Sequence, residues 1–61
     1  MKFKLEIDCD NAAFEDDAAG EVMRILNDLA ERIPIVIGRT LNLYDVNGNS
    51  VGRAWVEGGG G

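Results

Sequence analysis

Hydrophobic and charged residues alternate strictly over the first nine positions of the chain. The apolar set is Phe3, Leu5, Ile7 and Cys9, and the charged set is Lys2, Lys4, Glu6 and Asp8. A period of two is typical of a strand with one buried and one exposed face. We therefore expect a strand over residues 2–9, with Cys9 on its core face as an unreactive buried thiol.

A helical period follows a polar connection. Residues 10–17 are mostly polar, and we expect Phe14 to hold them against the core. Asp16 or Asp17 is suited to cap a helix, because a short carboxylate accepts hydrogen bonds from free backbone N–H groups. Apolar residues then recur at helical spacing at Val22, Ile25, Leu26, Leu29 and Ile33. This stripe predicts a helix over residues 18–33, which Pro34 ends by holding the preceding residue out of the α region.

The second half of the chain predicts two more strands joined by a tight turn. Ile35, Val36 and Ile37 are contiguous and β-branched, which favours a buried extended segment, and Gly38 is suited to a bulge at the start of the next strand. Residues 40–44 alternate again, Asn47-Gly48 favours a type I′ turn, and residues 51–57 form the return strand. Residues 58–61 are all glycine, which we interpret as a disordered tail or linker.

The predicted fold is α+β with the order β-α-β-β, in one small domain over residues 1–57. A three-stranded, mainly antiparallel sheet carries a single helix on one face. Placing the last strand in the middle makes every pairing antiparallel, whereas a parallel pairing of the first two strands would require a right-handed crossover. A chain of 61 residues has a small core, so association with a partner or a second copy often supplies further burial.

The register of the predicted hairpin decides which side chains it exposes. A two-residue turn pairs Tyr44 with Val51, Asn42 with Arg53, and Thr40 with Trp55. It leaves four candidate partner-binding residues exposed together, of types common in binding hot spots or apolar patches: Tyr44, Val51, Arg53 and Trp55. A three-residue turn with Gly48 in the left-handed region shifts the pairing by one residue and places Trp55 in the core. Both registers remain open from the sequence.

Acidic residues dominate the charge of the chain and gather in its first third. Eleven acids against six bases give a net charge of −5. The candidate acidic face consists of Asp8, Asp10, Glu15, Asp16, Asp17 and Glu21. The plainest interpretation is a solvated surface that also caps a helix. Two alternatives are a surface that imitates the phosphate rows of a nucleic acid and a divalent cation site, since hard cations bind carboxylate oxygens.

Composition excludes several kinds of chemistry. With no His and one Cys, the chain forms no internal disulfide, no Cys/His zinc site and no nucleophile pair with His. The segment 45–49 matches the first ligands of an EF-hand loop, but Ser50 and Val56 occupy positions that need Gly and Glu. We therefore predict no metal, no cofactor and no enzyme activity, because no side chain titrates near neutral pH without a strong perturbation.

Charge and hydropathy also limit the partners. The acidic balance argues against direct binding of nucleic acid, which depends on neutralising phosphates. No apolar run approaches the length that crosses a bilayer, so we expect no membrane association. The single Cys9 fits a reducing compartment, and a cytoplasmic location follows as an expectation.

Three segments together resemble a group of very small proteins encoded by bacteriophages and prophages. These segments are residues 10–16, the helix 21–33, and the turn 45–49 followed by Val51-Gly52. The resemblance spans residues 1–57, and the group carries no assigned activity, so it implies no site residue. It implies a small protein in a bacterial host cell that binds and redirects another protein. Some proteins of this kind inhibit restriction or CRISPR systems, and some of them do so by imitating DNA.

The expected function is therefore a non-enzymatic protein that binds a host or phage protein, or a second copy of itself, through its hairpin face. One alternative is an acidic decoy that imitates DNA and inhibits a host nuclease or defence complex, carried by the candidate acidic face. Another is a self-assembling structural protein.

Overall fold

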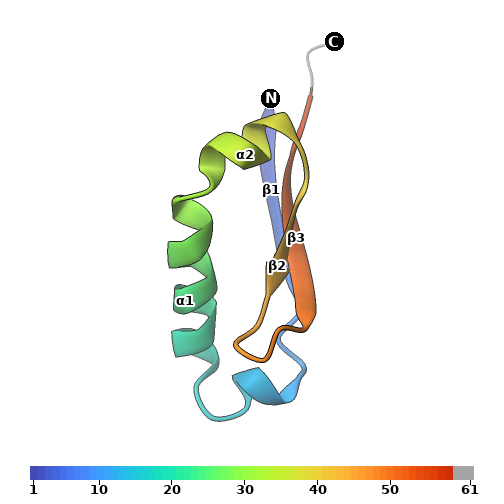
Figure 1. Cartoon of the computed structure of the whole chain (residues 1–61). Coiled ribbons are helices and arrows are strands. Elements are labelled where there is room, and N and C mark those ends of the chain that lie inside the picture. The colour runs from blue at the N-terminus through green and yellow to red at the C-terminus, as the bar shows by residue number, and fades with distance from the viewer. Residues whose placement is uncertain (59–61) are drawn as a thin grey trace.

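The computed structural model describes residues 1–58, so the predicted glycine tail lies, apart from Gly58, outside the described residues. The strands are β1 (Lys2–Ile7), β2 (Leu41–Tyr44) and β3 (Ser50–Glu57). The helices are the 3-10 turn η1 (Ala12–Phe14), α1 (Ala18–Ala30) and α2 (Ile33–Gly38). The sheet order is β1-β3-β2 with both pairings antiparallel, which confirms the small α+β fold (Figure 1). Of the two strand orders that the sequence left open, the structure has the one with the last strand in the middle.

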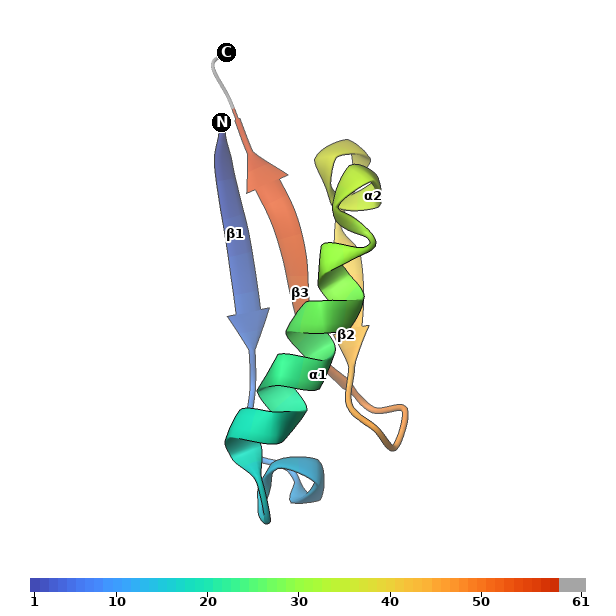
Figure 2. The same cartoon turned by 90° about the vertical axis from the view of Figure 1, so that its left-hand side faces the viewer.

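Both α-helices lie on one side of the sheet, and no helix within residues 1–58 covers the other side (Figure 1). The core forms between this helical layer and the sheet, and Phe14 closes one end of it, as expected. Its buried members are Phe14, Ile25, Leu29, Val36, Leu43, Val51 and Ala54. Figure 2 shows that α1 crosses the sheet obliquely and leaves the beginning of β1 uncovered.

Helix α1 begins at the predicted residue but ends at Ala30, three residues before the predicted end at Ile33, which belongs to α2. The side chain of Asp17 accepts a hydrogen bond from the backbone of Gly20 at 2.9 Å and caps the helix. The predicted extended segment over residues 35–37 is wrong, because these residues belong to α2. Pro34 stands in the first turn of α2, where its missing N–H leaves no hydrogen bond unmade, so it starts a second helix. Gly38 is the last residue of α2 and forms no bulge.

Strand β1 ends earlier than its alternating pattern predicts. It stops at Ile7, and the side chain of Asp8 accepts a hydrogen bond from the backbone N–H of Asp10 at 3.0 Å. Such a local turn competes with the sheet ladder. The predicted core position of Cys9 is therefore wrong, since its thiol is exposed.

The hairpin turn is the three-residue alternative. Gly48 has a φ of 86° and donates its N–H to the carbonyl of Asp45, while the N–H of Asp45 donates to the carbonyl of Asn49. Asn47 has no positive φ, so the predicted type I′ turn is wrong. Only glycine adopts the left-handed conformation without steric cost, which explains why a glycine stands here.

The strands nevertheless keep the register of the two-residue turn beyond a β-bulge. Tyr44 opposes Ser50 and Leu43 opposes Gly52, so Val51 is an extra residue on β3. Asn42 then opposes Arg53, as the two-residue turn predicts. The bulge thereby keeps Trp55 out of the helix-covered core, because Ala54 and Trp55 point to opposite faces.

Candidate functional site

The sheet face that the helices leave open carries three of the four predicted partner-binding residues. The guanidinium of Arg53 lies 4.9 Å from the centre of the Trp55 ring, a cation–π distance. Trp55 is half-buried, whereas Arg53 and Tyr44 are exposed. Thr40, Arg53, Trp55 and Glu57 together line a shallow hollow. The arrangement leaves an aromatic ring and a cation on a sheet face that no helix covers within residues 1–58.

Ion pairs border this open face on the β1 side. Lys4 lies 3.7 Å from Glu57, and Arg53 lies 3.8 Å from Glu6. These pairs join β1 to β3, and each is solvent-exposed, so each stabilises the fold by less than about 1 kcal/mol. Their main effect is to order the charged side chains around Trp55.

Val51 does not belong to the open face. The sequence predicts it to be exposed beside Tyr44, but its side chain is only 6% exposed and belongs to the core. The reason is the β-bulge, in which the extra residue on β3 turns its side chain to the helical layer. An alternating sequence pattern cannot reveal an extra residue in a strand, because the residues of β3 alternate regularly before and after the bulge.

Most of the candidate acidic face gathers at one end of the molecule. Asp8 and Asp10 follow β1, and Glu15, Asp16 and Asp17 lie between η1 and α1, at the lower end in Figure 1. All five are exposed, and none of them forms an ion pair with a base within residues 1–58. We call these five residues the acidic end. The opposite end, where β1 begins and α2 ends, holds three bases, Lys2, Lys4 and Arg39, and one acid, Glu57.

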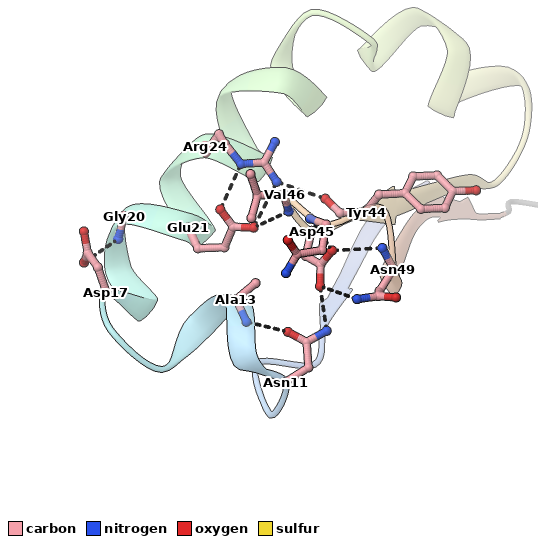
Figure 3. A network of polar contacts seen from close by, with 11 residues as sticks. Asn11, Ala13, Asp17, Gly20, Glu21, Arg24, Tyr44, Asp45, Val46 and Asn49 are labelled. Carbon is pink, nitrogen blue, oxygen red and sulfur yellow. Dashed lines mark hydrogen bonds and ion pairs between the residues drawn. The ribbon is translucent and has the colours of Figure 1, made fainter.

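Glu21 is separate from the acidic end, contrary to the sequence prediction. Its carboxylate is nearly buried and accepts hydrogen bonds from the Arg24 guanidinium at 2.9 and 3.0 Å and from the backbone N–H of Val46 at 2.8 Å (Figure 3). Arg24 also donates to the carbonyl of Tyr44 at 3.1 Å. These contacts attach α1 to the hairpin loop, so Glu21 has a structural role.

Asp45 is the second buried carboxylate in this network. It accepts hydrogen bonds from the side chains of Asn11 and Asn49 and from the backbone N–H groups of Asn47 and Asn49, at 2.7–3.2 Å (Figure 3). The EF-hand-like sequence is thus a turn whose first acid is occupied by internal donors. Within the described part of the chain, no group of three or more His, Cys, Asp or Glu side chains is placed to hold a metal ion.

Both buried carboxylates have a lowered pKa. Hydrogen bonds from Arg24 hold the pKa of Glu21 below its ordinary value, against the opposing effect of burial. Burial alone would raise the pKa of Asp45, but hydrogen bonds from Asn49, Asn11 and Asn47 outweigh it and lower the pKa. Carboxylates held in the charged form are suited to fix a fold and poorly suited to transfer protons near neutral pH.

A strip of apolar side chains along β1 is absent from the sequence-based prediction. Phe3 and Leu5 share the helix-covered side of the sheet with Ala54, yet they are 44% and 41% exposed. On α1, Arg24 and Asp28 lie beside β2, so the flank with Leu26 lies toward β1, and Leu26 is also exposed. The alternating pattern did signal an apolar face, but it could not show that one helix is too narrow to cover three strands.

Comparison of the chain with protein-family models, with curated proteins and with solved structures gives no match. No helix among residues 1–58 is both long and apolar enough to pass through a membrane.

Proposed function

We propose that this chain is a non-enzymatic binding protein whose open sheet face contacts another protein. The observation that carries the proposal is the position of Trp55 on the central strand of an uncovered sheet face, where its ring lies against the guanidinium of Arg53. Tyr44 lies on the same face of the sheet but opposes Ser50, toward the other end of β3. Trp, Tyr and Arg are the residue types that contribute most at protein interfaces. In the phage or prophage setting that the resemblance implies, the partner is a protein of the bacterial host or of the phage.

The arrangement of the face supports recognition of a protein more than of a small molecule. Its hollow is shallow. The lining consists of the hydroxyl of Thr40, the ring of Trp55 and the charged groups of Arg53 and Glu57. Small-molecule sites are usually deep and largely apolar. A flat, partly preordered face instead suits a protein surface that offers an apolar side chain to Trp55 and a carboxylate to Arg53.

The experiment is capture of partners from bacterial lysate by the immobilised chain, followed by binding of the purified captured protein. Trp55 is the only tryptophan, so its emission reports directly on the open face. We expect wild-type chain to capture a partner whose binding changes this emission, and Trp55→Ala to lose the capture. Met23→Ala is the matched control, because Met23 is exposed on α1, away from the open face. Equal capture by Trp55→Ala with an unchanged circular dichroism spectrum would overturn the proposal.

The second candidate function is an acidic decoy for the basic cleft of a nuclease or defence complex. The specific support is the acidic end, where five exposed carboxylates lie together without an internal cation. Binding through such a surface weakens steeply with salt. Capture should then be lost between low and high salt and in an Asp16→Asn/Asp17→Asn variant, whereas Trp55→Ala should retain it. A captured partner that survives high salt and depends on Trp55 excludes this candidate.

A further inference from the structure

Strand β1 has one edge that pairs with no other strand of the described chain. The sheet order places β1 at one edge and β2 at the other. The β2 edge has four residues, whereas β1 has six. Short edges resist pairing with other chains, and long edges need protection or a partner. The longer β1 edge is therefore the one that we expect to be covered by a partner.

The backbone groups on the free edge of β1 belong to its apolar residues. The N–H of Asp8 donates to the carbonyl of Val51 at 2.7 Å, in the same register as the β1–β3 pairs. Hydrogen-bonded pairs alternate in an antiparallel ladder, so the even residues of β1 face β3. The N–H and C=O groups of Phe3, Leu5 and Ile7 consequently point away from β3 toward the open edge.

We infer that β1 pairs with β1 of a second copy, antiparallel and centred on Leu5, to form a homodimer with one continuous sheet. In this register Leu5 opposes Leu5 of the second copy and Phe3 opposes Ile7. The outward backbone groups of both strands then meet as hydrogen-bonded pairs. The apolar strip with Phe3 and Leu5, exposed in the single chain, becomes the centre of the interface.

Charge complementarity selects a second copy as the occupant. The first half of β1 is basic and its end is acidic. Centring on Leu5 places Lys4 opposite Glu6 of the second copy and Lys2 opposite Asp8, and the two-fold axis repeats each pair. Shifting the register by one pairing step places Lys4 against Lys4 or Glu6 against Glu6, which is repulsive. Only the register centred on Leu5 pairs the outward backbone groups, buries the apolar strip and places opposite charges against each other.

A strand from an unrelated protein would match the charges of β1 less well than a second copy of β1 does. Lysines on an edge strand normally oppose pairing with other chains. A second copy supplies an acid for each of Lys2 and Lys4, and it supplies them from the same short strand. The dimer is independent of the partner proposed for the open face, because Trp55 stays uncovered on the extended sheet.

Charge reversal at the two central positions tests the dimer. We expect sedimentation to give wild-type chain twice the 6.6 kDa of one copy. Lys4→Glu alone opposes acid to acid, and Glu6→Lys alone opposes base to base, so each variant should raise the dimer dissociation constant at least about tenfold. An equimolar mixture of the two variants restores opposite charges at both pairs of positions 4 and 6 across the dimer and should regain the mass of two chains, as should the double variant K4E/E6K.

The controls separate loss of pairing from loss of folding. Glu31→Lys, an exposed reversal on the helical side, should leave the mass unchanged. Circular dichroism of each variant checks the fold, and recovery in the mixture cannot occur if either chain is unfolded. Wild-type chain that stays at the mass of one copy up to millimolar concentration overturns the inference. So does a dimer that is unaffected by both single reversals, since it must then use another surface.

Discussion

The side-chain amide of Asn11 donates a hydrogen bond to the carboxylate of Asp45, and the two atoms lie 2.7 Å apart across 34 positions of sequence. The contact joins the connection after β1 to the hairpin loop. Because the same carboxylate also binds the backbone of Asn47 and Asn49, one buried side chain fixes both loops. The acidic end and the hairpin are therefore mechanically coupled.

Removing this carboxylate should loosen both loops together. We expect Asp45→Ala to lower the melting temperature by roughly 10 °C, because several donors lose their acceptor at once. Asn11→Ala should have a smaller effect, since it removes one donor. Thermal unfolding of the two single variants and the double variant gives their coupling. Additive losses would show that the Asn11–Asp45 contact contributes nothing.

Stability should fall on acidification because both Glu21 and Asp45 have a lowered pKa in the fold. A carboxylate with a lowered pKa stabilises the fold above its unfolded pKa, and this contribution is lost as the pH falls through the folded value. The ordinary values are 4.5 and 3.8, so the loss should begin near pH 4.5 and continue below. Urea unfolding across pH 2–7 measures it. Glu21→Gln and Asp45→Asn should each flatten this profile, and an unchanged slope in both would contradict the assignment.

Gly52 should be intolerant of any side chain. A Cβ atom at this position would collide with the backbone carbonyl of Glu6, where β1 and β3 approach closely. Gly52→Ala must separate the strands, and we expect a loss of roughly 2 kcal/mol or more in the free energy of unfolding. Gly38→Ala is the matched control, because a Cβ there meets nothing within 4 Å. Chemical denaturation of both variants provides the comparison, and equal effects would refute the close approach.

The bulge predicts opposite outcomes for two residues near the turn. Val51 is buried, so Val51→Ala should destabilise the fold by about 1–2 kcal/mol through lost burial. Tyr44 is 51% exposed, so Tyr44→Ala should cost less than about 1 kcal/mol. Denaturant midpoints distinguish the two variants. A larger loss of stability in Tyr44→Ala than in Val51→Ala would contradict the burial of Val51 and, with it, the β-bulge.

Patterns of period two and of helical spacing were sufficient to predict the three strands and α1, but they left a parallel pairing of the first two strands open. They failed where one residue changes the local geometry. Pro34 does not end α1, which stops at Ala30, and the residue before Pro34 is helical. Pro34 instead stands in the first turn of α2, where it costs no hydrogen bond. The bulge at Val51 lets a three-residue turn coexist with the strand register of a two-residue turn, a combination that neither pattern alone predicts.

The candidate site shows the same division. The sequence identified Trp55, Arg53 and Tyr44 by residue type, and the strand register placed them on one face. The sequence grouped Glu21 with the acidic end because these residues are close along the chain. In the structure, the guanidinium of Arg24 and the backbone N–H of Val46 bind the Glu21 carboxylate inside the fold. Exposure of Phe3 and Leu5 depends on the width and direction of α1, which are three-dimensional properties with no local signal.

The separation of charge along the longest dimension of the molecule, 42 Å, gives the chain a permanent electric dipole. In the field of a positively charged surface this dipole experiences a torque that turns the acidic end forward before contact, so diffusion selects the orientation of the encounter. In the antiparallel pair proposed for β1 the two dipoles point in opposite directions and cancel. The paired molecule would then carry a negative pole at each extremity and approach a basic surface equally well from either end.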